Sequence, residues 1–136
     1  MKKRGFATLA TLVILGMNLP SGVALAQQPA PTENKGVVNK PLGVVDLGPE
    51  IEGMAGRQLR IRMVTIEPGG VIAVHNHKDR PSVEYVLQGR VTEYRNGVAK
   101  EYGPGDFVTA NKDTTHGWEN KGAVPVVLLP VDIFKP

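Results

Sequence analysis

Cysteine is absent from all 136 residues of this chain. A disulfide, a thiol nucleophile and a thiolate metal ligand are therefore excluded. Burial of apolar side chains has to stabilise the fold, and any bound metal has to take nitrogen and oxygen ligands.

Helical periodicity is a second absence. Beyond residue 26, no stretch repeats its apolar residues with the period of an amphipathic helix. Short apolar or alternating runs follow one another instead, separated by Gly- and Pro-containing turns at intervals of about 8–12 residues. This pattern predicts an all-β fold, an antiparallel sandwich or barrel.

Turn residues divide the predicted strands. Pro68-Gly69-Gly70 predicts a turn between two strands, and Asn96-Gly97 is a strong hairpin signal. Prolines at 125 and 130 interrupt the last apolar run. We expect strands over residues 57–67, 71–77, 82–87, 90–95, 98–102, 107–110 and 123–133.

The first 26 residues have the composition of a secretory signal peptide. Lys2, Lys3 and Arg4 precede an apolar run that is too short to span a bilayer core of about 30 Å, so no stable membrane anchor is expected. Small residues before Gln27 place cleavage near Ala26. We expect the protein in the periplasm or secreted, through the general pathway or, given Lys3-Arg4, the twin-arginine one.

Positive charge is concentrated in that predicted signal peptide, which holds three of the 16 Lys and Arg residues and none of the 13 Asp and Glu residues. The remaining 110 residues carry 13 charges of each sign. Such a balance gives no bulk field to hold nucleic acid, which we exclude as a partner. Residues 27–41, with three prolines, predict a flexible N-terminal arm ahead of one domain over 42–136.

Histidine occurs at only three positions, His75, His77 and His116. Residues i and i+2 of a strand point to the same face, so His75 and His77 can present two imidazoles to one point. A third imidazole from a neighbouring strand would complete a metal site. A pair of histidines on a solvent face, with no ligand, is the alternative.

Two motifs make the chain resemble the cupin superfamily. Gly69, followed after five residues by His75-x-His77, and Tyr85-Val-Leu-Gln-Gly89 match the first motif. Pro104-Gly105-Asp106 and His116-x-x-x-Asn120 match the second. The resemblance implies a small single-domain jelly-roll β-barrel that binds a divalent metal through the three histidines and the glutamate of the first motif.

That glutamate is displaced in this chain. Ser82 holds the family's position, and the nearest acid is Glu84, which alternation places on the same face of the strand. Three roles stay open for Glu84: a fourth metal ligand, an acid that orients a histidine or a bound water, and a partner of Arg62 or Arg90. Without it, the site would be the three-histidine type found in the cysteine and acetylacetone dioxygenases.

The resemblance implies an exported enzyme acting on a small molecule, dioxygenase-like or a lyase or isomerase, with Glu84 as ligand or catalytic base. A non-catalytic cupin that binds a small molecule or a metal is the alternative. Imidazole ligands leave Fe, Mn, Zn, Ni and Cu open.

Three further expectations concern ligands and partners. Arg80, in the loop after His77, can pair with a substrate carboxylate, although a solvated Arg80 or one paired with Asp79 is the alternative. Trp118 lies on the same face as His116 and either walls the substrate pocket or packs in the core. Cupins often meet through flat sheet faces, which implies a homodimer, with residues 124–131 as interface or simply as core.

Overall fold

The computed structural model describes residues 29–136, so the predicted signal peptide lies outside the described residues. Within this part of the chain there is no α-helix, and a search for helices long and apolar enough to cross a membrane finds none. The eight strands are β1 (Lys35–Asp46), β2 (Gln58–Asn76), β3 (Ser82–Gln88), β4 (Val91–Arg95), β5 (Val98–Tyr102), β6 (Phe107–Ala110), β7 (Thr115–Glu119) and β8 (Val126–Phe134).

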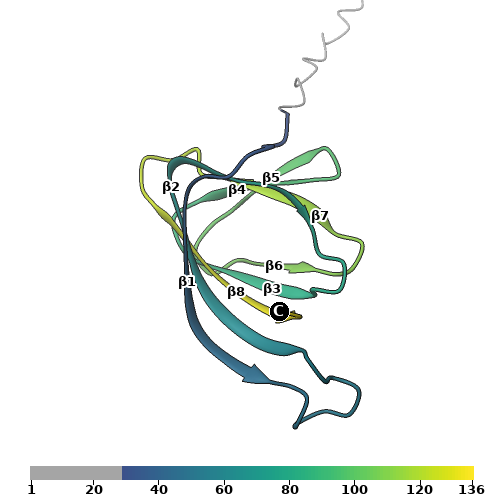
Figure 1. Cartoon of the computed structure of the whole chain (residues 1–136). Coiled ribbons are helices and arrows are strands. Elements are labelled where there is room, and N and C mark those ends of the chain that lie inside the picture. Colours follow the sequence, from purple (N-terminus) through teal and green to yellow (C-terminus); the bar gives the residue numbers. More distant parts are fainter. Residues whose placement is uncertain (1–28) are drawn as a thin grey trace, which may run out of the picture.

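The strand pairs of the described residues are antiparallel. Seven strands follow the order β5-β4-β7-β2-β8-β3-β6, and β1 pairs with β2 outside this path. The first half of β2 pairs with β8 and its second half with β7. The sheet therefore curls into a nearly closed barrel, with β3, β6 and β8 on one side and β4, β5 and β7 on the other (Figure 1). This confirms the predicted all-β, antiparallel jelly-roll barrel.

The turn predicted at Pro68-Gly69-Gly70 is a bend inside one long strand, so residues 57–67 and 71–77 are not separate strands. Gly69 adopts a positive φ of 70°, and a Cβ on Gly70 would lie 2.7 Å from the Glu67 carbonyl oxygen. Asn120 secures the bend, because its N–H donates to the Gly70 carbonyl (2.9 Å) and its carbonyl accepts from the Gly69 N–H (2.9 Å). Glycine at both positions lets the chain change direction without breaking the ladder.

Strand β1 occupies the second half of residues 27–41, the segment predicted as a flexible arm. β1 begins at Lys35, and Val37 and Val38 lie opposite Ile66 and Thr65 of β2. Prolines suggested an arm, but Pro41 occupies an edge strand, where its missing N–H breaks no essential ladder bond. The domain therefore includes residues that the sequence assigned to the arm.

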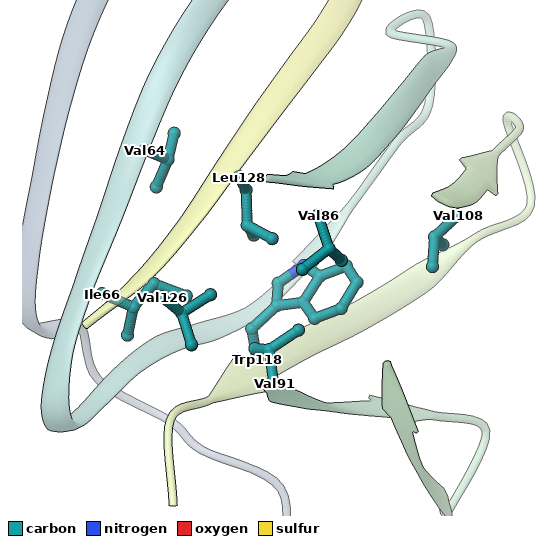
Figure 2. Packing of buried hydrophobic residues seen from close by; sticks show 8 residues of the cluster. All are labelled: Val64, Ile66, Val86, Val91, Val108, Trp118, Val126 and Leu128. Atoms are coloured by element: carbon teal, nitrogen blue, oxygen red, sulfur yellow. The ribbon is translucent and has the colours of Figure 1, made fainter. Parts of the chain in front are cut away.

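The core lies inside the barrel, where alternate residues of the strands meet (Figure 2). The Trp118 indole lies between Val86 of β3 and Val91 of β4, and is 1% exposed. Both walls of the barrel thus pack on one aromatic side chain. The buried cluster comprises Val64, Ile66, Val86, Val91, Val108, Trp118, Val126 and Leu128.

The closing run, residues 124–131, divides between the two faces of β8. Val126, Leu128 and Pro130 are buried, while the residues between them are half-buried on the outer face. Pro130 lies within the strand, so the predicted interruption there does not occur. The inner half of the run belongs to the core. The homodimer interface expected on its outer half stays a prediction.

Leu128→Ala should lower the free energy of unfolding by about 2–5 kcal/mol, because it removes a side chain that is 1% exposed in the core. Urea denaturation measures this loss. Leu87→Ala is the matched control, since Leu87 is 48% exposed on β3, and it should change stability by less than about 1 kcal/mol. Equal losses for the two variants would contradict the described packing.

Candidate metal centre

The three histidines converge at one end of the barrel. His75 in β2 lies directly opposite His116 in β7, and His77 follows β2 by one residue, with its N–H bonded to the Thr114 carbonyl (2.9 Å). Alternation places His75 and His77 on the inner side, as predicted. Together they form a group of side chains that can hold a metal ion.

Each imidazole is oriented through its Nδ1 atom. His75 Nδ1 lies 2.9 Å from the Ala73 carbonyl oxygen, and His77 Nδ1 lies 3.0 Å from the Arg80 carbonyl oxygen. His116 Nδ1 lies 2.6 Å from Oε1 of Glu93. Carbonyls and an ionised carboxylate only accept hydrogen bonds, so every Nδ1 carries the proton. The Nε2 atom of each ring is left with its lone pair.

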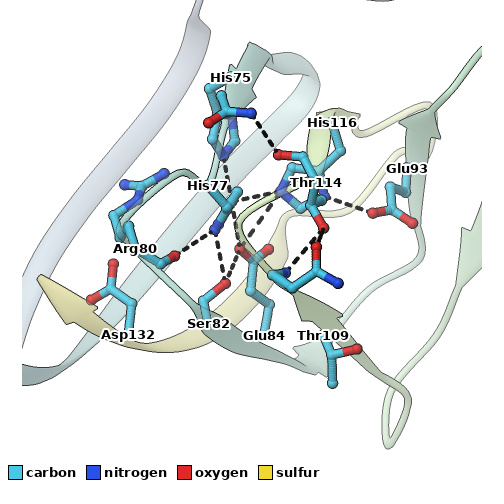
Figure 3. A network of polar contacts seen from close by, with 12 residues as sticks. His75, His77, Arg80, Ser82, Glu84, Glu93, Thr109, Thr114, His116 and Asp132 are labelled. Carbon is cyan, nitrogen blue, oxygen red and sulfur yellow. Dashed lines mark hydrogen bonds and ion pairs between the residues drawn. The ribbon is translucent and has the colours of Figure 1, made fainter.

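Those Nε2 atoms face one another. His77 Nε2 lies 3.1 Å from His75 Nε2 and 3.0 Å from His116 Nε2, and Figure 3 shows the three rings pointing together. With the protons on Nδ1, these are contacts between lone pairs, and a cation between the rings would turn the repulsion into bonds. The donor set therefore fits a divalent metal.

The two separations also bear on coordination geometry. Ligands at right angles around a metal, with bonds of about 2.1 Å, lie about 3.0 Å apart, whereas a tetrahedral angle separates them by about 3.4 Å. Two of the nitrogen separations, 3.0 and 3.1 Å, are near the right-angled value, and all three histidine ligand atoms lie within 4.8 Å of one another. The spacing is therefore short enough for one metal ion to contact all three rings.

Glu84 points from β3 toward the same place, although it lies two residues beyond the family's position. Its Oε1 atom is 3.6 Å from His77 Nε2 and 3.7 Å from His116 Nε2. The predicted partners are bonded elsewhere: Arg62 pairs with Asp132 and Arg90 with Glu101. Of the three open roles, the geometry favours those in which Glu84 acts at the histidines.

Ser82, at the family's glutamate position, supports Glu84. Its hydroxyl donates to Oε1 of Glu84 (3.2 Å) and also lies 3.2 Å from His77 Nδ1. Burial raises the pKa of Glu84, while His116 and the Ser82 hydrogen bond act in the opposite direction. A cation at the histidines would stabilise the ionised form of this buried carboxyl.

Glu93 of β4 is a site residue that the sequence analysis missed. Besides His116, its carboxylate is bonded by Arg95 Nε (2.8 Å) and the Tyr102 hydroxyl (3.2 Å). Burial acts to raise the pKa of Glu93, but the hydrogen bonds from His116 and Arg95 outweigh it and hold the pKa below its usual value. Glu93 belongs to no motif, and its place in a predicted strand between Thr92 and Tyr94 was the only signal.

A cavity of about 430 Å³ adjoins the histidines. Both predicted pocket residues, Arg80 and Trp118, line it together with His75 and Glu84. Trp118 is also a core residue, so it lines the cavity and packs in the core at the same time, and its place in a substrate pocket stays a prediction. The ion pairs among residues 29–136 do not include one between the Arg80 guanidinium and Asp79.

An antiparallel β-barrel with three inward-facing histidines at one end defines a class of small barrels that can bind a metal. Residues 62–133 match the cupin domain, which is more than half of the chain. The protein belongs to the cupin family.

Similar proteins agree with this assignment. KdgF from Halomonas sp. has 22% sequence identity and a TM-score of 0.58, covering 71% of this chain and 78% of that one. A Cupin 2 conserved barrel domain protein from Salinispora arenicola has 16% identity and a TM-score of 0.56, covering 74% and 79%. These two likenesses concern the fold alone.

Mannose-1-phosphate guanylyltransferase ManC from Salmonella typhimurium is 29% identical over 77 residues. The match covers 57% of this chain but 16% of that protein. The chain therefore corresponds to a small part of this curated relative.

Glu93→Ala should weaken metal binding by about 10–100-fold, because the His116 ring loses the carboxylate that fixes its tautomer and orientation. Calorimetric titration with Ni²⁺ measures the affinity. Glu93→Gln should recover part of it, since the amide oxygen still accepts from Nδ1. Glu101→Ala, at an exposed ion pair, is the control. A metal affinity of Glu93→Ala equal to that of the control would show that Glu93 does not orient His116.

The metal-free protein should lose stability on acidification. Burial lowers the pKa of His77 from 6.5 to about 4, and burial also lowers the pKa of His75. Between pH 6.5 and 4, the unfolded chain therefore binds more protons than the folded one, so stability is full above pH 6.5 and falls as the pH drops.

Urea denaturation with a chelator at pH 7.5 and 4.5 tests this. On going from pH 7.5 to 4.5, the free energy of unfolding of the wild type should fall by about 2–3 kcal/mol more than that of a His77→Gln variant, which lacks the titrating group. The comparison between variants also removes the opposite contribution of Glu84, whose pKa is raised. Equal pH dependence of both proteins would contradict the assignment.

Proposed function

We propose that this cupin binds one divalent cation through His75, His77, His116 and Glu84 and uses it on a small molecule held in the adjoining cavity. The observation that carries the proposal is the set of three Nε2 lone pairs directed at one another by fixed Nδ1 hydrogen bonds. Side chains without a ligand gain nothing from such an arrangement, because the contacts are repulsive.

Glu84 is proposed as the fourth ligand. Its Oε1 atom lies nearly equidistant from the Nε2 atoms of His77 and His116, at 3.6 and 3.7 Å, as expected for ligands that share a metal. Three neutral imidazoles and one carboxylate give a site of net charge +1 for a divalent ion, and Ser82 holds the carboxylate in place. Imidazole and carboxylate ligands suit Fe, Mn, Zn, Ni and Cu alike, so the proposal names a divalent metal of this set.

A metal at these residues would polarise a chelated carbonyl or carboxylate oxygen and, if redox-active, would support reaction with dioxygen. The chain's own contribution is to orient the imidazoles, exclude bulk water and provide a buried carboxyl. We therefore propose a dioxygenase-like, lyase or isomerase reaction, in a protein that is exported to the periplasm or medium. The nucleotidyl transfer of the larger ManC is not proposed for this chain.

A non-catalytic binding protein is the second candidate. The observation that favours it is Ser82, which replaces the acid at the family's position and leaves Glu84 as the one carboxyl paired with the Nε2 atoms of the histidines in the described part of the chain. If Glu84 serves only as a ligand, no base remains next to a bound molecule. The cavity would then hold a ligand without turnover.

Elemental analysis of the purified protein should find about one divalent metal per chain, and a His75→Ala/His77→Ala variant should lose it. The measurement uses protein recovered from the compartment in which it accumulates. Absence of metal from the wild type, even after incubation with Fe²⁺, Mn²⁺, Ni²⁺ and Zn²⁺, would contradict the proposal.

Glu84→Gln separates the two candidates once metal is found. An enzyme that depends on the carboxylate should retain the three histidines' metal with weaker affinity and lose turnover by about 100-fold or more in an oxygen-uptake or substrate screen. A binding protein should show no turnover in either form. Glu101→Gln, on the exposed surface, is the matched control for loss of one acid.

A further inference from the structure

Two arginines stand out in the cavity beside the metal centre. Arg62 of β2 and Arg80 of the loop before β3 line it together with His75, Glu84 and Trp118. Most other lining residues are apolar, among them Val37, Val64, Ile72, Leu128 and Pro130. The cavity thus joins an apolar wall to a cluster of positive charge.

Arg62 is not satisfied by the protein around it. Arg60 bonds both oxygens of the buried Asp132, with Nε at 2.7 Å and Nη2 at 3.0 Å, and this leaves Arg62 a single contact of 3.3 Å to that carboxylate. Among the buried side-chain N and O atoms of residues 29–136, Arg62 Nε is the one without a hydrogen-bond partner. A buried charged donor left unpaired is costly, which indicates that a ligand completes it.

Arg80 has its backbone fixed and its guanidinium available. Its N–H donates to the His77 carbonyl (3.0 Å), and its own carbonyl accepts from His77 Nδ1 (3.0 Å), as Figure 3 shows. Within the described residues, its guanidinium forms no ion pair and no side-chain hydrogen bond. The loop that orients the His77 imidazole therefore also holds the positive charge of Arg80 at the edge of the metal centre.

The charges around the cavity do not balance without a ligand. Arg62 and Arg80 line the cavity with Glu84 as its one acidic lining residue, and Arg62 shares the carboxylate of Asp132 with Arg60. Burial lowers the pKa of Arg62, Asp132 raises it, and the neighbouring Arg60 and Arg80 lower it further. Arg62 and Arg80 line the same cavity, so one anion bound in it can contact both guanidinium groups.

We propose that Arg62 and Arg80 bind the carboxylate of a small organic acid whose apolar part lies against the cavity wall. The acid would reach the metal with its remaining polar atoms, and this last step rests on the function proposed above. A carboxylate matches the planar fork of a guanidinium and can accept the free Nε–H of Arg62. The substrate class is thus a small carboxylic acid with an apolar body.

A phosphate is less suited to this cavity. Glu84 lines the same cavity. Its negative charge and that of Asp132 would repel a doubly charged phosphate more strongly than a singly charged carboxylate. The apolar wall offers phosphate oxygens no donor. A volume of about 430 Å³ is in the range of sites for small molecules and is too small for a polymer segment.

The fluorescence of Trp118, the single tryptophan of the chain, provides a direct reading of binding, because its ring lines the cavity. Metal-free and Ni²⁺-loaded protein are titrated with cyclohexanecarboxylate, with acetate, and with cyclohexanecarboxamide, which has nearly the same shape but no charge. Inorganic phosphate is titrated as the competing anion. We expect saturable binding of the carboxylates and at least tenfold weaker binding of the carboxamide and phosphate.

Arg80→Gln should weaken carboxylate binding about tenfold or more, as loss of a charge-assisted hydrogen bond does. Arg62→Lys, which keeps the charge near Asp132 but removes Nε, should weaken it as well and guards against misfolding of a variant without charge. Arg90→Gln is the matched control, since Arg90 pairs with Glu101 on the exposed surface, and it should bind as the wild type does.

Equal affinity for carboxylate and carboxamide, or wild-type affinity in Arg80→Gln, would overturn the proposal. Tighter binding of phosphate than of either carboxylate would overturn the substrate class, and so would the lack of saturable binding by the wild type. Metal analysis keeps the two proposals apart. Arginine-dependent carboxylate binding in a protein without metal would refute the metal function alone, and bound metal with indifferent arginine variants would refute this inference alone.

Discussion

The double pairing of β2 is the constraint on which the rest of the structure depends. One half of this strand is hydrogen-bonded to β8 and the other half to β7, so the strand has to bend where it passes from one wall of the barrel to the other. Gly69 and Gly70 permit the bend, and Asn120 bonds the backbone of both. Once β2 bends here, the sheet curls around one interior, and His75 comes to lie across from His116.

Burial of polar groups inside this barrel is tolerated because almost every one of them has a partner. Glu93 forms an ion pair with Arg95 and accepts a hydrogen bond from His116, and Asp132 forms an ion pair with Arg60, so their carboxylates remain charged out of water. Within residues 29–136 the exceptions are the Nε2 atoms of the histidines, which face one another, and Nε of Arg62. His75 and Arg62 line the same cavity, and unsatisfied groups of this kind in an otherwise satisfied interior are the observations on which both proposals rest.

Alternation within strands explains why much of the site was predictable. His75 and His77 share a face for local reasons, and Ser82 and Glu84 share one for the same reason, so their inward direction follows from the strand period. The strand start at Lys35 was missed because proline-rich sequence signals an arm whether or not an edge of the sheet is free to pair with it. Glu93 was missed because its hydrogen bond with His116 joins β4 and β7, and no residue near Glu93 in the sequence indicates that His116 is its partner.

The sequence by itself determined the all-β class, most strand positions, the hairpin at Asn96-Gly97 and the identity of the three histidines, since periodicity and turn chemistry act over a few residues. The tertiary structure alone decided which atoms meet. The tautomer of His116, the position of Glu84 relative to the rings and the unpaired Nε of Arg62 all depend on registers between strands far apart in the chain. Those registers follow from packing the whole barrel at once, and no local pattern specifies them.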